Sequence, residues 1–174
     1  MAAQNRSRKV KRLALMGLLF ALAMALSFLE SLLPALPMLP PGIRLGLSNI
    51  VTMYALFVLG PVSGYTIAVL KALFVLLTRG AVAAAMSAAG GVFSVTIMLL
   101  LSLLPGIKEQ YLLLSVFGGA AHNIGQLVMA RFIINNQYVW YYFPVLLVAG
   151  LLMGAITGMA LRVVLPYLNR LNLK

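Results

Sequence analysis

The chain has 174 residues, of which 63% are hydrophobic and only 9% are charged, whereas a water-soluble domain is about a quarter charged. Most of this apolar excess must face lipid, so the composition predicts an all-α, multi-pass membrane protein in contact with the lipid bilayer. With no cysteine, no aspartate, two glutamates and one histidine, the chain lacks the ligand clusters of metal sites, and we predict neither a metal centre nor an enzyme. The net charge of +11 is spread along the chain, which fits membrane topology and not nucleic-acid binding.

A basic tail over residues 1–11 precedes the first apolar segment, residues 12–33. We expect this segment to be a retained helix and not a cleaved signal peptide, because the apolar run is long and no cleavage motif follows it. Gly17, Ala21 and Ala25 recur every four residues and form a small face. Such a face allows close helix packing, either inside the chain or against a partner subunit.

A proline-rich loop separates the first helix from the second apolar segment, residues 46–60, which is short for a membrane span. Gly60 and Pro61 form a turn into the third segment, residues 62–79. Lys71 lies deep within this segment. A buried ammonium needs a partner, which is either Glu30 of the first segment or an anionic ligand.

Three further apolar segments follow at residues 81–104, 110–132 and 139–164, before a basic tail at 166–174. The sequence therefore predicts a six-helix transmembrane domain over residues 12–165. If the N-terminus is cytoplasmic, nine basic residues fall inside and three fall outside, namely Arg44, Arg79 and Arg131. The positive-inside rule then places both termini in the cytoplasm.

The fifth segment carries three polar side chains within the run GGAAHNIGQ: His122, Asn123 and Gln126. At 100° per residue, His122 and Gln126 share one helix face and Asn123 lies at its edge. Two interpretations remain open, contact with a ligand and hydrogen bonding between helices. Catalysis by His122 is disfavoured because no acidic group lies nearby in the sequence to orient it.

The outer arginines suggest a basic funnel. Arg44, Arg79 and Arg131, together with Lys71, would attract an anion, because guanidinium groups recognise carboxylate and phosphate. The alternative is that the arginines are separate anchors at the membrane interface. Our candidate ligand-binding residues are Arg44, Asn49, Lys71, Arg79, His122, Asn123 and Gln126.

Longer stretches of the sequence resemble a known family. The segments RLGLSNIVTMYAL, LGPVSGY and GGAAHNIGQ are similar to the Gx transporter family, also called heptaprenyl diphosphate synthase component I. More loosely, the chain resembles the substrate-binding (S) components of energy-coupling factor (ECF) transporters over residues 12–165.

This resemblance implies a six-helix S-component fold in the bacterial cell membrane, with an outward-facing cavity for a small molecule. It also implies partners: a transmembrane coupling protein, which would contact Ala21 and Ala25, and two cytoplasmic ATPases that would use ATP. No cofactor is expected in this chain. Several S components carry an acidic residue where this chain has Lys71, so the resemblance leaves the ligand unidentified.

Two other functions compete with transport. The family's second name suggests a membrane-bound accessory of prenyl diphosphate or quinone biosynthesis. Prenyl diphosphate synthases hold magnesium with aspartate-rich clusters, which this chain cannot build, so we exclude the role of catalyst. The third possibility is an assembly factor that transports nothing.

Overall fold

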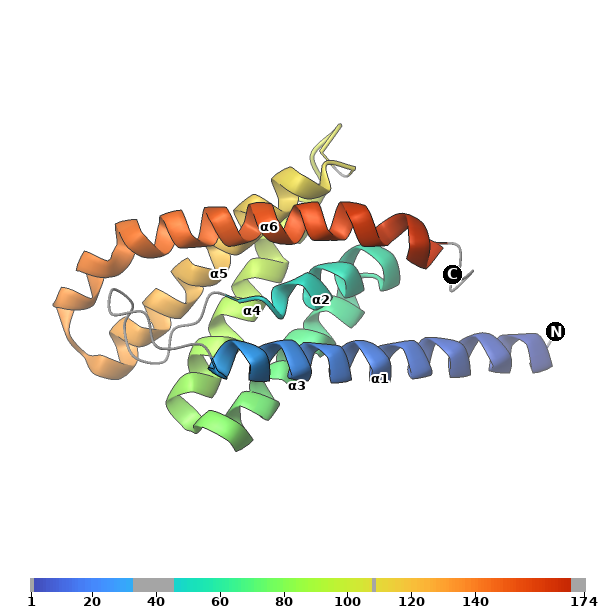
Figure 1. The fold of residues 1–174 in the computed structure, drawn as a ribbon, viewed down its shortest axis with the longest axis horizontal. Coiled ribbons are helices and arrows are strands. Elements are labelled where there is room, and N and C mark those ends of the chain that lie inside the picture. The colour runs from blue at the N-terminus through green and yellow to red at the C-terminus, as the bar shows by residue number, and fades with distance from the viewer. Residues whose placement is uncertain (1, 33–45, 108, 170–174) are drawn as a thin grey trace.

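The computed structural model describes residues 2–32, 46–107 and 109–169, which are helical apart from short turns (Figure 1). The α-helices are α1 (Ala2–Leu32), α2 (Asn49–Tyr54), α3 (Pro61–Arg79), α4 (Ala81–Ser102), α5 (Tyr111–Ile134) and α6 (Phe143–Asn169). A π-helical segment, Ala55–Leu59, continues α2, and a 3₁₀ segment, Gln137–Tyr142, precedes α6. The prediction of an all-α protein with six helical segments is confirmed.

Five of these helical regions are long and apolar enough to cross a membrane, and the region Asn49–Leu59 is not. At 1.5 Å per residue this region is about 16 Å long, roughly half of a bilayer core. The helix α1 begins at Ala2, so most of the segment predicted as a basic tail is helical. The start of α1 and the end of α6 lie toward the same side of Figure 1.

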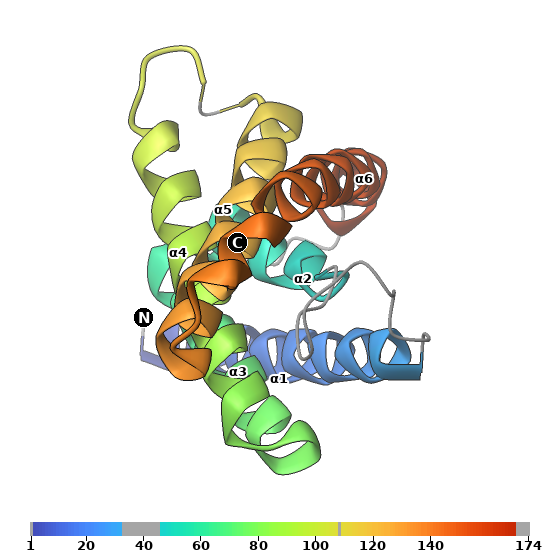
Figure 2. The ribbon, with the colours of Figure 1, turned by 90° about the vertical axis from the view of Figure 1, so that its left-hand side faces the viewer.

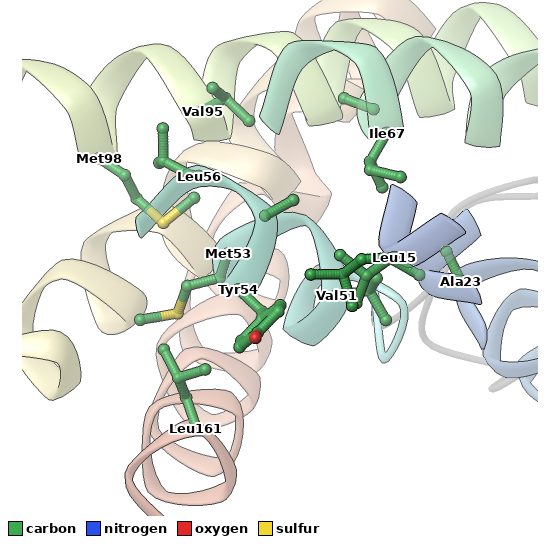
Figure 3. Close-up of a cluster of buried hydrophobic side chains, with 13 residues drawn as sticks. Leu15, Ala23, Val51, Met53, Tyr54, Leu56, Ile67, Val95, Met98 and Leu161 are labelled. Carbon is green, nitrogen blue, oxygen red and sulfur yellow. The ribbon is translucent and has the colours of Figure 1, made fainter. Parts of the chain in front are cut away.

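The short helix α2 is enclosed by the rest of the bundle. Its neighbours are α1, α3, α4 and α6, and six consecutive residues from Val51 to Leu56 are buried. In Figures 1 and 2, α2 lies between α1 and α6. Figure 3 shows α2 side chains such as Met53 packed toward Met98 of α4 and Leu161 of α6. Because protein surrounds α2, its two ends need not reach the membrane surfaces.

Glycine allows α5 to pack closely on both of its main neighbours, α4 and α6. A Cβ atom added at Gly154 of α6 would lie 2.4 Å from the carbonyl oxygen of Ser115, and one at Gly119 would lie 2.3 Å from that of Gly150. On the side facing α4, a Cβ at Gly125 would lie 2.9 Å from the Ala89 carbonyl oxygen. The regularly spaced glycines of α6 therefore serve internal packing, as small residues do where membrane helices meet.

Replacing Gly154 by alanine is expected to force α5 and α6 apart, because the new methyl group would collide with backbone atoms that cannot rotate away. Overpacking of this kind costs about 1–3 kcal/mol, so the midpoint of thermal unfolding in detergent should fall. The matched control is Gly17→Ala, since a Cβ there has nothing within 4 Å and alanine favours a helix. Equal midpoints for the two variants would contradict the close packing described here.

Candidate ligand-binding site

A polar recess lies where α1 and α3 end and α4 begins, which we call the charged recess. Five segments contribute to its lining, which consists of Ser27, Glu30, Gly46, Ser48, Lys71, Val75, Arg79, Ala83, Ser87, His122 and Gln126. The charged groups are two cations and one carboxylate, so the wall carries a net charge of plus one. The recess thus collects four of the predicted binding residues: Lys71, Arg79, His122 and Gln126.

Lys71 is almost completely buried, with 2% of its surface exposed. Its ammonium donates a hydrogen bond to Oδ1 of Asn49 at 2.7 Å, and Glu30 attracts it electrostatically. An ammonium has three donors, and among the described residues only the bond to Asn49 engages one of them. A buried cation at the wall of a recess favours a hydrogen-bond acceptor there.

Glu30 fixes the chain just before α2. Its carboxylate accepts a short hydrogen bond from the backbone N–H of Gly46, and both residues are buried. Gly46 has a φ angle of +89°, and a Cβ on it would lie 2.6 Å from Nδ2 of Asn49. Only glycine adopts this positive φ angle readily and also lacks the Cβ atom that would collide with Asn49. Glu30 and Gly46 together therefore set the position of Asn49 beside Lys71.

The polar residues of α5 face two different neighbours. Nε2 of His122 lies 2.6 Å from the side-chain nitrogen of Gln126, and both side chains line the charged recess. Asn123 instead donates to the backbone carbonyl of Leu146 on α6 at 2.9 Å, so it joins two helices. Asn123 therefore makes a hydrogen bond between helices and does not line the recess, whereas His122 and Gln126 are placed where a ligand could contact them.

The predicted basic funnel is only partly assembled by the described residues. Arg79 lines the charged recess beside Lys71. Arg131 donates to the side-chain oxygen of Asn135 at 3.3 Å at the end of α5, and it is not part of the recess wall. Arg44 lies outside the described residues.

A second recess shares the lining residue Gly46 with the first. We call it the methionine recess, because its lining is Gly46, Asn49, Met53, Ser94, Met98, Ser115, Gly118, Gly119, Met153, Gly154 and Thr157. Asn49 connects the two recesses, since it lines this one and accepts the hydrogen bond from Lys71 in the other. With the side chains in these positions, each recess has room for about one water molecule.

Sequence reasoning expected methionine among the residues lining a binding cavity, but it did not identify the three methionines of this recess, and it missed the anchoring contact of Glu30. Methionines in a membrane helix are indistinguishable in sequence from other lipid-facing apolar residues. Glu30 carried a usable signal, because it is one of two carboxylates in the chain and a buried carboxylate requires a donor. Its donor, a backbone amide sixteen residues away, has no signature in the sequence.

Comparison with known proteins adds two findings. A fold similar to this one occurs in a solved structure, the S component of a bacterial ECF transporter, with a TM-score of 0.65 and 21% sequence identity. The similarity covers 93% of this chain and 95% of the other, so the two share an overall fold. No curated protein matches the sequence.

A family model described as heptaprenyl diphosphate synthase component I matches residues 19–164. The matched range includes both the Lys71–Asn49 pair and the polar residues of α5. The chain is a member of the heptaprenyl diphosphate synthase component I family.

Proposed function

We propose that this protein is the substrate-binding membrane subunit of an ECF-type transporter and takes up a small, anionic organic molecule. The observation that carries the proposal is Lys71, a buried ammonium with one hydrogen bond to described residues, at the wall of a recess inside a lipid-embedded bundle. Ionisable groups at membrane depth are costly and typically mark the path or binding site of a substrate. The shared fold with an ECF S component supports the same function.

The ligand is an anion because the charged groups of the recess carry a net positive charge. The Lys71 ammonium would donate to an acidic group, with Arg79 adding a second cation nearby. His122 and Gln126 offer neutral hydrogen-bonding groups at the same wall. These residues bind and orient a molecule without bond-making chemistry, so the protein is a binding subunit and not an enzyme.

The distribution of basic residues supports an orientation in the bacterial cell membrane with both termini in the cytoplasm. In this orientation, the cationic beginning of α1 faces the cytoplasm and the ends of α1 and α3 face outward. The charged recess lies at that outward end, as uptake from outside the cell requires. Transport would follow reorientation of the subunit in the membrane.

The energy for transport would come from partners. Gly17, Ala21 and Ala25 form an exposed stripe on α1, and a Cβ added at Gly17 has nothing within 4 Å. Because all three small residues are exposed in the part of the chain that the structure describes, they suit close approach by a helix of a transmembrane coupling protein. Two cytoplasmic ATPases bound to that protein would hydrolyse ATP.

The family name favours a second candidate, a non-catalytic membrane accessory of prenyl diphosphate or quinone biosynthesis. The chain's two carboxylates do not lie together, since Glu30 is near the end of α1 and Glu109 precedes α5 at the other end of the bundle. They therefore do not form the carboxylate cluster that holds magnesium and diphosphate. Purification with a prenyl synthase, in place of a coupling protein, would favour the accessory role.

Native mass spectrometry of the purified protein is expected to reveal a bound organic anion, and Lys71→Met should release it. Methionine has a similar length, but it removes the cation that faces the buried carboxylate of Glu30. Occupancy is therefore compared only after circular dichroism and size-exclusion chromatography show that the variant is folded like the wild type. Arg131→Ala is the control, because it removes a cation outside the recess and should retain the ligand. Equal occupancy in the wild type and Lys71→Met would contradict the proposed site.

Enlarging the α1 stripe should weaken assembly. When the protein is co-expressed with the coupling protein and the two ATPases, Ala21→Leu combined with Ala25→Leu is expected to reduce the amount of coupling protein that co-purifies at least several-fold. Leu152→Phe on the exposed face of α6 is the control and should leave assembly unchanged. Normal assembly of the double variant would exclude the stripe as the interface.

A further inference from the structure

The two recesses differ in chemistry and share one lining residue, Gly46. The charged recess contains Lys71, Arg79 and Glu30, whereas the charged residues are absent from the lining of the methionine recess. Gly46 lines both, and Asn49 of the methionine recess holds the ammonium of the charged one. A molecule that extends past Gly46 would therefore have a charged end and an apolar end in separate surroundings.

The charged recess suits a single negative charge. The charged side chains of its lining are two cations, Lys71 and Arg79, and one carboxylate, Glu30, so their charges sum to plus one. A monoanion brings this sum to zero, while a dianion would leave an excess negative charge in a poorly solvated place, which is costly. A carboxylate has two oxygen atoms, and each can accept one of the two donors of Lys71 that Asn49 does not engage.

The methionine recess suits an apolar group that displaces side chains. Its lining includes three glycines of α5 and α6, three methionines, and the polar residues Asn49, Ser94, Ser115 and Thr157. The methionines are Met53, Met98 and Met153. Methionine side chains have three rotatable bonds and repack readily around different partners. The recess can therefore enlarge beyond the size of a water molecule by rotation of side chains, with the helix backbones held in place by glycine contacts.

We propose that the ligand is an amphipathic monocarboxylate, whose carboxylate binds Lys71 and whose apolar body enters the methionine recess past Gly46 and Asn49. This inference rests on the proposed function and specifies the substrate class of the same site. It assigns the three methionines to binding of the ligand's apolar part.

The test uses straight-chain probes in place of the unknown ligand. Binding of acetate, butyrate and hexanoate to the ligand-free protein is measured by native mass spectrometry and by the shift in thermal unfolding, with hexanol and hexylamine as uncharged and cationic controls. Each buried methylene increases affinity about fourfold. We expect hexanoate to bind more than tenfold tighter than acetate, and hexanol and hexylamine to bind at least tenfold more weakly than hexanoate.

Two variants separate the parts of the site. Lys71→Met should lose hexanoate binding at least tenfold. Gly118→Ala should bind acetate normally and lose most of the gain from chain length, because the added Cβ would lie 2.7 Å from Sδ of Met98 and push this flexible side chain into the recess. Normal acetate binding by Gly118→Ala is the control for the packing of α5, because a misfolded variant would lose acetate as well as hexanoate.

Equal binding of acetate and hexanoate, or of hexanol and hexanoate, would overturn the proposed substrate class. Release of a multiply charged or wholly polar co-purified molecule by Lys71→Met would also overturn it, while leaving the proposed transport function intact. Failure of the proposed function gives a different result: the protein would carry no organic ligand that depends on Lys71 and would bind none of the probes.

Discussion

The close approach of helix backbones at glycine residues fixes the rotation of α5 and so directs the polar side chains that α5 contributes to the candidate site. On one side of α5, Gly119 meets Gly150 of α6, and on another Gly125 meets the backbone of α4. Since backbone atoms are in contact, α5 has little freedom to rotate about its axis. This fixed rotation directs His122 and Gln126 into the charged recess and Asn123 toward α6. Glycine packing therefore decides which polar groups can meet a ligand.

The enclosed helix α2 has a complementary role. A spanning helix at its place would carry apolar residues through the whole bilayer, whereas α2 begins at Asn49 within the bundle. Its first residue can then accept a hydrogen bond from Lys71, a group that lipid could not accommodate. Because α2 is short, its first residue lies inside the bundle and can bind the buried cation of α3. Lipid-facing helices enclose this polar interior.

The apolar segments and their proline and glycine boundaries were sufficient to predict the helices, including the short length of the second. The sequence also identified Lys71, Arg79, His122 and Gln126, because polar groups in apolar helices are conspicuous. It did not predict their neighbours. His122 and Asn123 are adjacent in sequence and 100° apart on α5, and only the packed structure reveals that one faces a recess and the other faces α6. The bond from Lys71 to Asn49 joins two helices and has no local pattern.

Arg12 of α1 donates hydrogen bonds to the carbonyl oxygen of Leu59 at 2.8 Å and to Oγ of Ser63 at 3.2 Å, at the turn where the π-helical segment meets α3. Glu30, near the other end of α1, holds the N–H of Gly46 just before α2. The outermost helix is therefore fastened to both ends of the Asn49–Leu59 region. A displacement of α1 along its axis would therefore strain these hydrogen bonds and the segment that places Asn49 beside Lys71.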